Sequence, residues 1–355
     1  MGLKVVFCWT DISGYMAACW RALVASPEID SFVVAFQAKT ETAFSDQLME
    51  GIPCHLLDLE KRHDFSHIKS LAKEQNPDVI VLNGWFHRPY YRLAFASEFR
   101  DTNFVLTMDT PWWGTWKQHL APYLLRPFLQ RMSQVVVTGE RSWQYAWRLG
   151  MPPERIYKGL YGIDFDALSP LWAERQAYWP KSFLYIGRYN SVKGIDVMVQ
   201  AYRQYCQTVK DPWPLVCCGQ GDLAHLLENQ PGIKNLGFVQ PQQVLNQLGA
   251  AGTLVLPSRF DPWPLALVEA AAAGLPVLCT EACGSAVELV RQGYNGWTVS
   301  SHNVEALSQG FATIQHNYDY LPTWGQRAQI FAAAYSTSLW AERWQHQLKA
   351  LTTAI

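Results

Sequence analysis

Two acidic residues, Asp261 and Glu269, stand eight positions apart in SRFDPWPLALVEAAAAG, where a predicted loop leads into an alanine-rich helix. Earlier in the chain, Arg188 directly follows an apolar run, and Lys193 precedes Gly194 and a helical pattern. A planar guanidinium and a mobile ammonium suit the oxygens of a diphosphate. The free N–H groups at a helix start also attract anions, and Glu269 lies too far along to cap that helix. An acid so placed can accept hydrogen bonds from ribose hydroxyls.

Each of these residues also has an ordinary structural explanation. Arg188 and Lys193 could be surface cations of a solvated loop. Asp261 could be an acid favoured by the helix dipole, with Glu269 on the surface. These explanations account for each residue singly but not for their arrangement at successive strand–loop–helix junctions.

The elements that must position these residues follow an alternating pattern. Short apolar runs alternate with amphipathic stretches, which predicts parallel sheets with crossover helices and hence an α/β fold. The strands are expected in KVVFCW, SFVVAFQ, DVIVLNG, NFVLTMD and QVVVTG, and again in SFLYIGR, WPLVCCGQG, IKNLGFV, GTLVLPS and LPVLCTE. Two Rossmann-like, doubly wound domains are therefore expected to face each other across a cleft, where ligands bind outside the strands' carboxyl ends.

The domain boundaries follow from the same pattern. We expect an amino-terminal domain over residues 1–165, a second domain over 166–335, and a terminal helix over 336–355 that packs back toward the first domain. The hinge is predicted at about Phe165 to Lys181, where Pro170 and Pro180 limit regular structure.

Composition restricts the class of protein. The 355 residues carry a formal net charge of −1, which gives no support to nucleic acid as a partner. The eight cysteines form no CxxC pair, a pattern typical of buried thiols in a reducing compartment rather than of disulfides or zinc. The sequence contains neither a signal peptide nor an apolar run of the roughly 18 residues that a membrane span needs. A soluble, cytoplasmic protein is expected.

The quoted segments GRYNSVKG, CCGQGDL, NLGFV, LPSRFDPWPLALVEAAAAGLPVL and ACGSAVELVRQGYNGWTV resemble the carboxy-terminal domain of retaining, nucleotide-sugar-dependent glycosyltransferases of family 4. The resemblance extends from Phe183 to about Val299 and reaches the amino-terminal half only in outline. It implies the GT-B architecture. It also implies transfer of a sugar from a nucleoside-diphosphate donor to the hydroxyl of a glycan, a lipid-linked or a small-molecule acceptor.

The resemblance assigns roles to particular residues. Arg188 and Lys193 would hold the diphosphate, Glu269 the ribose, and Asp261 the donor sugar. The full set implied for donor binding is Gly14, Arg188, Lys193, Gly219, Phe238, Val239, Asp261, Trp263, Pro264, Leu265 and Glu269. The residues expected to take part in catalysis are Asp261, Arg188, Lys193 and Asp109. The acceptor is expected to contact Trp85, Tyr90 and Asp109.

The chain departs from the family pattern at two positions. Asp261 replaces the usual Glu, and Met108, followed by Asp109, stands where the family commonly has His. The implied mechanism needs no protein nucleophile, because the acceptor attacks on the face that the phosphate leaves and the phosphate takes the proton. No metal or other cofactor is expected, because the cations and a helix start supply positive charge.

Three further points stay open at this stage. The pair Asp164 and Asp166 matches an acid-x-acid pattern that holds metal-bound nucleotide sugars elsewhere, although a capping or hinge role is favoured. Residues 110–139 hold three cations (Lys117, Arg126 and Arg131) and no acid, so they could contact an anionic membrane surface, shape the acceptor groove or simply cover the core. A nucleotide-sugar epimerase or phosphorylase, or a non-catalytic glycan- or partner-binding protein, remains an alternative to the transferase. The oligomeric state is not predicted.

Overall fold

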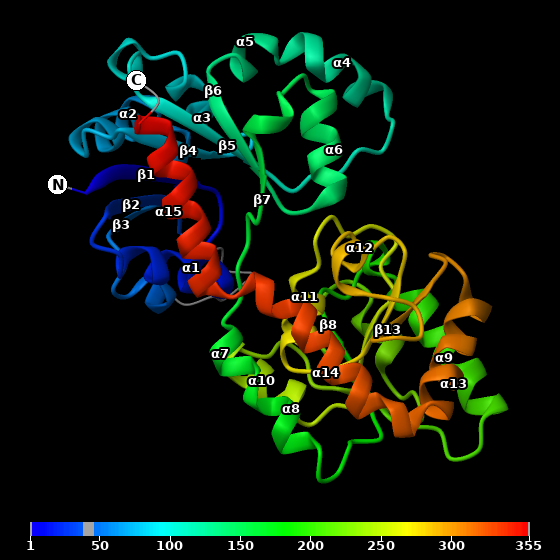
Figure 1. Ribbon diagram of the computed structural model, residues 1–355. Helices are drawn as coiled ribbons and strands as arrows, with labels where there is room; N and C mark the ends of the chain where they lie inside the picture. Colours follow the sequence, from blue (N-terminus) through cyan, green and yellow to red (C-terminus); the bar gives the residue numbers. More distant parts are fainter. Residues whose placement is uncertain (1, 38–45, 354–355) are drawn as a thin grey trace. The chain divides into compact units, whose positions relative to one another are not determined.

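The computed structural model describes residues 2–37 and 46–353, and the chain divides into two compact units (Figure 1). Unit 1 comprises Met1–Ile163 and Thr337–Ile355, and unit 2 comprises Asp164–Ser336. These bounds differ by at most two residues from those predicted, at 163 against 165 and at 336 against 335. The end of the chain therefore belongs to the same unit as its beginning.

Unit 1 is built around a parallel sheet whose described strands lie in the order β3-β2-β1-β4-β5-β6-β7. The order reverses between β1 and β4, which creates a crevice outside the carboxyl ends of these two strands. The strands are β1 (Leu3–Trp9), β2 (Ile29–Phe36), β3 (Cys54–Leu57), β4 (Val79–Asn83), β5 (Asn103–Met108), β6 (Met132–Val137) and β7 (Ile156–Lys158). The helices are α1 (Gly14–Val24), α2 (Phe65–Glu74), α3 (Arg88–Leu93), α4 (Trp116–Leu124), α5 (Arg126–Leu129), α6 (Glu140–Arg148) and α15 (Thr337–Thr353).

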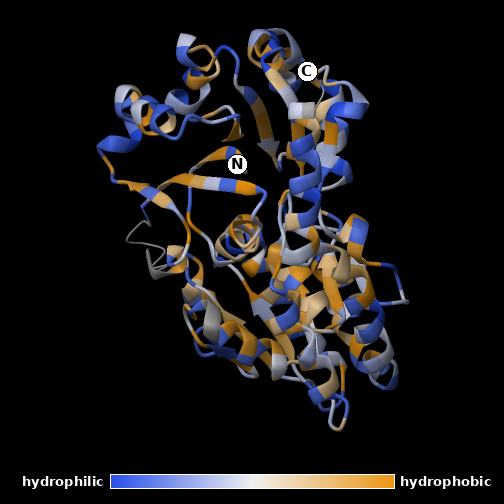
Figure 2. Ribbon diagram, turned by 60° about the vertical axis from the view of Figure 1, so that its left-hand side comes forward, coloured by the Kyte–Doolittle hydropathy of each residue, from blue (hydrophilic) through white to orange (hydrophobic). Residues whose placement is uncertain are grey.

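The strands of unit 1 are apolar throughout because both faces of the sheet are covered. Alternate residues of one strand enter different cores: Val6 and Cys8 of β1 face one cluster, whereas Val5 and Phe7 face the other. The second cluster includes side chains of α1 and α15, which pack against each other. Figure 2 shows these helices with both hydrophilic and hydrophobic bands, as expected for helices with one buried face.

Unit 2 repeats the arrangement, with its described strands in the order β10-β9-β8-β11-β12-β13, all parallel. Here the order reverses between β8 and β11. The strands are β8 (Phe183–Ile186), β9 (Leu215–Cys218), β10 (Ile233–Asn235), β11 (Thr253–Leu256), β12 (Val277–Thr280) and β13 (Gly296–Val299). The helices are α7 (Phe165–Leu168), α8 (Pro170–Arg175), α9 (Ile195–Thr208), α10 (Pro241–Gly249), α11 (Leu265–Ala272), α12 (Ala286–Leu289), α13 (Val304–His316) and α14 (Leu321–Ala332). The predicted α/β class with two Rossmann-like sheets is confirmed.

A buried cation ties the helices of unit 2 together. Arg175, at the end of α8, is 3% exposed and donates to the carbonyls of Leu248, Gly249, Ala273 and Gly274. These carbonyls lie at the carboxyl ends of α10 and α11, where the helices have no further N–H groups to bond them. Burial lowers the pKa of Arg175 to about 10, so this side chain stays charged at neutral pH.

Three strands were not predicted from the sequence, and one segment was misjudged. The strands β3, β7 and β13 lie at edges of the sheets and are only partly buried, so they carry no continuous apolar run. The predicted hinge at Phe165 to Lys181 is wrong in its local structure, since it holds α7 and α8. Pro170 begins α8 at its first turn, where the missing N–H group costs nothing.

Candidate functional site

The loop after β8 carries the two predicted cations of unit 2. Arg188 is exposed, and its side chain has no hydrogen bond or ion pair to another described residue. Lys193 ends the 3-10 helix η5 (Ser191–Lys193), which Asn190 caps by accepting the Lys193 N–H at 3.0 Å. The ammonium of Lys193 is consequently held on a short, ordered turn rather than on an open loop.

Gly194 fixes that turn against the end of β11. Its φ of +73° lies in the left-handed region, and a Cβ atom added there would stand 2.1 Å from the carbonyl oxygen of Pro257. Only glycine permits both the backbone conformation and so close an approach. The loop of β8 is thereby pressed onto the loop that carries Asp261.

A second contact joins the same two loops. Arg259 donates to both carboxylate oxygens of Asp196, at 2.7 and 2.5 Å, and to the carbonyl of Ser191 at 2.6 Å. The two side chains are partly exposed. This bidentate pair lowers the pKa of Asp196 and, with the bond to Ser191, ties Arg259 to η5 and to the first turn of α9.

Asp261 is 8% exposed and is held by the backbone of a third loop. Its N–H donates to Ala282 and its carbonyl accepts from Gly284, while its carboxylate forms an ion pair of 2.5 Å with Lys193. A Cβ on Gly284 would lie 1.7 Å from the oxygen of Pro262, so the loops of β11 and β12 are in close contact. The predicted acid and the predicted lysine thus meet across 68 positions of sequence.

These loops surround a cavity of about 300 Å³ at the point where the strand order of unit 2 reverses. The first residues of α11 contribute their backbone, and the N–H groups of Leu265 and Ala266 stand where the helix has no preceding turn to bond them. The residues that line the cavity are Tyr185, Ile186, Gly187, Arg188, Lys193, Leu256, Asp261, Trp263, Pro264, Leu265 and Ala266. Two cations, one carboxylate and a helix amino terminus therefore share this cavity, which carries net positive charge.

Glu269 lies on α11 one turn beyond this cavity and is not among its lining residues. Its side chain is only partly accessible, and burial raises the pKa of its carboxyl to about 7. No described residue donates a hydrogen bond to that carboxyl. An unpartnered acid next to an anion-binding cavity is able to accept hydrogen bonds from a ligand.

Three other residues of unit 2 that the resemblance implies do not line this cavity. Gly219 packs on the backbone of Gly187, whose carbonyl oxygen would lie 1.8 Å from an added Cβ, so Gly219 holds the loops of β8 and β9 together. Phe238 and Val239 are half-buried in the segment between β10 and α10.

In unit 1 the predicted residues follow β1, β4 and β5. Gly14 begins α1, and Asp109 lies beside Tyr161, where burial and then the charge of Asp109 raise the pKa of the tyrosine hydroxyl. Met108, at the position of the usual histidine, is 4% exposed. Trp85 is half-buried against the ring of Tyr145, with centroids 6.3 Å apart.

The prediction that Tyr90 stacks on an acceptor is wrong. This side chain is fully buried, and its hydroxyl donates to the carbonyls of Trp9 and Val34 at 3.0 and 3.1 Å. Its sequence position after β4 suggested a site residue, but α3 turns it into the core.

The pattern of Asp164 and Asp166 has a structural explanation. The Asp164 side chain accepts the N–H of Ala167 and caps α7. Within residues 2–37 and 46–353, no group of three or more His, Cys, Asp or Glu side chains is placed to hold a metal ion. The helices in this part of the chain include none with the length and apolar character of a membrane span.

Some residues that line the cavity were not predicted from the sequence. Tyr185 lies in β8, with its hydroxyl bonded to the carbonyl of Arg188 at 2.8 Å, and Leu256 ends β11. Both belong to apolar runs that read as core. Their only sequence signal is their place at the last positions of strands next to the switch point.

Comparison with known proteins agrees with this geometry. Residues 175–331 match the family described as Glycosyl transferases group 1, and residues 12–157 match the Glycosyl transferase 4-like domain. The chain belongs to the family 4, group 1 glycosyltransferases that these two models describe. The resemblance expected from the motifs is confirmed, and so is the GT-B fold.

Relatives of this chain include a putative colanic acid biosynthesis glycosyltransferase, WcaL, of Salmonella typhimurium, 29% identical over 184 residues. That match covers 48% of this chain and 45% of WcaL. An uncharacterized glycosyltransferase of Methanocaldococcus jannaschii is 27% identical over 190 residues, covering 49% of this chain and 46% of the relative. The chain thus spans about half the length of the curated relatives it matches.

Among solved structures, Anabaena HepE in complex with UDP and glucose aligns with a TM-score of 0.76 at 17% identity. The alignment covers 98% of this chain and 100% of HepE. At this identity the likeness shows the fold alone.

Proposed function

We propose that this chain transfers a sugar from a nucleoside-diphosphate sugar to a hydroxyl group of an acceptor, with retention of anomeric configuration and without a metal. The observation that carries the proposal is the cavity in which Arg188, Lys193 and the amino terminus of α11 converge with Asp261. The structure of HepE with UDP and glucose supports a uridine or related donor for a fold of this kind.

The cavity suggests how a donor is held. The diphosphate accepts from the unpartnered guanidinium of Arg188, from Lys193 and from the N–H groups of Leu265 and Ala266. Because an ammonium has three donors, Lys193 can keep its bond to Asp261 while it binds a phosphate oxygen. The ion pair thereby fixes the lysine where negative charge develops on the leaving diphosphate.

The two acids bind the two sugars of the donor. Asp261 faces the transferred sugar, and the ionised form of Glu269 accepts hydrogen bonds from the ribose. Asp261 is the single acid among the residues that line the cavity. A double displacement through a carboxylate uses two carboxyl groups about 5 Å apart, so this lining favours direct attack by the acceptor, with the departing phosphate receiving its proton.

The names of the relatives suggest an acceptor class. WcaL is named for colanic acid biosynthesis, and a growing polysaccharide or glycoconjugate is accordingly the acceptor that we propose. Trp85 and Asp109 remain proposed acceptor contacts of unit 1.

Release of nucleoside diphosphate from UDP-, GDP- and ADP-sugars, with and without added saccharide acceptors, tests the proposal. Lys193→Ala should lower acceptor-dependent release by at least about 100-fold, the scale of losing one charge-stabilising donor, and Glu269→Ala should lower it by weakening donor binding. The matched controls Lys210→Ala and Glu228→Ala change exposed residues of unit 2 and should retain activity. Thermal unfolding establishes that each variant is folded.

Two results would contradict the assignment. Full activity in both site variants would contradict the site assignment, and conversion of the nucleotide sugar or of a glycan without net release of nucleoside diphosphate would favour an epimerase or a phosphorylase. NMR of the product reports its anomeric configuration, so an inverted product would overturn the retaining mechanism alone.

We also propose that α4 rests on an anionic lipid surface. Ala121 packs toward the core, whereas Trp116, Leu120, Tyr123 and Leu124 point outward and are 68%, 46%, 78% and 73% exposed. Exposed apolar faces of this kind mark protein or membrane contacts. The absence of acids from residues 110–139 favours the membrane, because anionic lipids attract the nearby Lys117 and Arg126.

Sedimentation with vesicles of phosphatidylglycerol and phosphatidylcholine tests this contact. Leu120→Ser with Leu124→Ser should greatly reduce sedimentation, and Ile330→Ser, at an equally exposed apolar position of unit 2, should not. Wild-type protein that does not sediment with the vesicles would contradict the lipid contact. Dimers that are lost in the double variant would show that a protein rather than lipid covers α4.

A further inference from the structure

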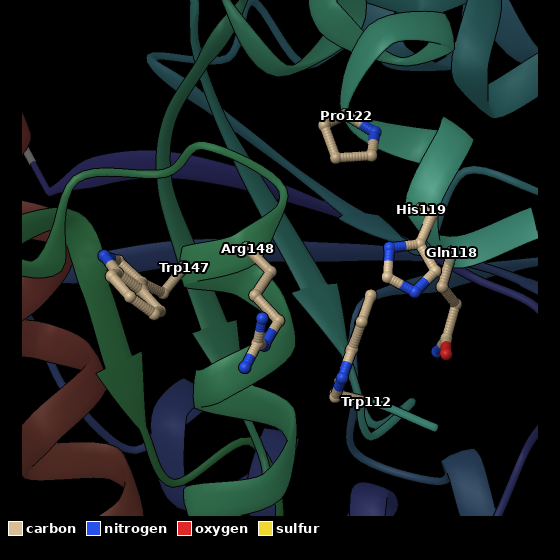
Figure 3. Close-up of a pocket in the computed structure, with 6 residues that line it drawn as sticks. All are labelled: Trp112, Gln118, His119, Pro122, Trp147 and Arg148. Atoms are coloured by element: carbon tan, nitrogen blue, oxygen red, sulfur yellow. The ribbon is translucent and has the colours of Figure 1, made fainter. Parts of the chain in front are cut away.

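A second cavity, of about 240 Å³, lies within unit 1 between α4 and α6 (Figure 3). It is lined by Trp112, Gln118, His119, Pro122, Trp147 and Arg148. Four of these residues belong to the stretch 110–139 that could shape the acceptor groove, and none of the residues that the resemblance implies individually lines the cavity. Its volume is just below the roughly 300–1,000 Å³ of pockets for drug-sized ligands, which suits a single sugar ring.

Aromatic rings and a cation form the walls. The guanidinium carbon of Arg148 lies 4.8 Å from the ring centroid of Trp112, and the ring of His119 meets the same indole edge-on at 4.9 Å. Figure 3 shows Arg148 from α6 and His119 from α4 on opposite sides of the gap, with Trp112 below them. Trp147 is 51% exposed beside the opening. Such rings offer apolar faces to the C–H side of a sugar.

The polar groups of this cavity are available to a ligand. The Arg148 guanidinium and the His119 imidazole form no hydrogen bond or ion pair with another described residue. No acidic residue lines the cavity, so the charge of Arg148 is not neutralised there. A guanidinium that is already stacked on an indole keeps its edge N–H groups free for a planar anion.

The walls are held in place before a ligand arrives. Thr115 and Gln118 form a capping box at the start of α4, and the buried Gln118 also bonds the carbonyl of Pro111 and the N–H of Trp113, each at 2.8 Å. On the other side, Ser142 anchors α6 to the carbonyl of Asp109 at 2.9 Å. Little ordering is therefore required when the cavity is filled, which favours binding.

We propose that this cavity binds a saccharide that carries a negative charge, as a subsite for the acceptor. The sugar ring stacks on Trp112 or Trp147, and Arg148 pairs with a carboxylate or a phosphate on the ring. The role as an acceptor subsite rests on the proposed transferase function, whereas the binding itself does not. The site therefore gives the acceptor a chemical class: an acidic sugar or a sugar phosphate.

Saturation-transfer NMR with the full chain tests the binding without donor or turnover. Glucuronate, glucose 1-phosphate and neutral glucose serve as the probes, and the first two distinguish a carboxylate from a phosphate. We expect at least one anion to bind about tenfold or more tightly than glucose. Arg148→Gln should abolish that preference, Arg148→Lys should restore part of it, and the control Arg155→Gln, at an exposed arginine of unit 1, should leave it unchanged.

The outcomes separate this site from the donor site. Arg148→Gln should leave the thermal shift caused by UDP-glucose, GDP-mannose or ADP-glucose unaltered, and Lys193→Ala should leave the anion preference unaltered. Equal binding of all three probes, or an unchanged preference in Arg148→Gln, would overturn the proposal even if the transferase function holds. An anion preference that depends on Arg148 supports the site even if the donor assignment fails.

Discussion

The raised pKa of Glu269 makes donor binding sensitive to pH near neutrality. Burial shifts this carboxyl from its usual 4.5 to a pKa of about 7. If the ribose binds the ionised form, the binding-competent fraction of the protein is about 0.9 at pH 8 and about 0.1 at pH 6. Since the apparent Kd scales inversely with the competent fraction, donor affinity should fall about tenfold between these pH values.

The stability of the free protein should respond in the opposite direction. A carboxyl whose pKa is raised on folding binds its proton more tightly in the native state. The stabilisation is complete below pH 4.5 and is lost as pH rises through 7. Deprotonation thus weakens the free protein while it prepares the donor site, and these opposed trends distinguish Glu269 from a general loss of fold at low pH.

Isothermal titration calorimetry between pH 5.5 and 8.5 measures the effect, with whichever of UDP-glucose, GDP-mannose and ADP-glucose gives the largest thermal shift. Glu269→Gln is the matched control, because an amide does not titrate. The donor affinity of this variant should not depend on pH and should be close to that of wild type at low pH. His302, which accepts from Arg259 at 3.1 Å, is unchanged in this variant. A wild-type affinity independent of pH, or a slope that survives in Glu269→Gln, would refute the reasoning.

Three further perturbations address the scaffold of unit 2. Gly194→Ala should lower the free energy of unfolding by about 1–2 kcal/mol through the left-handed φ alone, and further because the added Cβ collides with Pro257. A melting temperature equal to that of wild type would contradict the close approach. Arg175→Met should lower the free energy of unfolding in urea by about 3 kcal/mol or more, because it leaves several buried carbonyls unpaired. A loss below about 1 kcal/mol would show that water bonds these carbonyls instead. Arg259→Ala should weaken donor binding several-fold while costing only about 1 kcal/mol of stability, since the pair with Asp196 is partly exposed. Asp196→Ala should weaken donor binding to the same degree, and the double variant Arg259→Ala/Asp196→Ala should bind the donor little more weakly than either single variant. Additive losses of affinity would show that the two side chains act independently.

The cavity of unit 2 could be predicted because its sequence signals are local. A buried parallel strand is a continuous apolar run, and the residues directly after it lie at the carboxyl edge of the sheet whatever the rest of the chain does. Arg188 and Lys193 follow β8, and Asp261 follows β11, so their common location required only that these two strands be neighbours. The ion pair between Lys193 and Asp261 is the consequence.

Only the tertiary structure determined which aromatic and apolar side chains are covered by other parts of the chain. Tyr90 and Trp112 both follow strands of unit 1, yet α3 turns the first into the core and the second borders a cavity. The apolar pattern of α4 marks a face, but the pattern is the same whether protein or solvent meets it. Periodicity fixes which residues share a face, whereas the packing of distant segments fixes what that face touches, and only the folded chain contains that second piece of information.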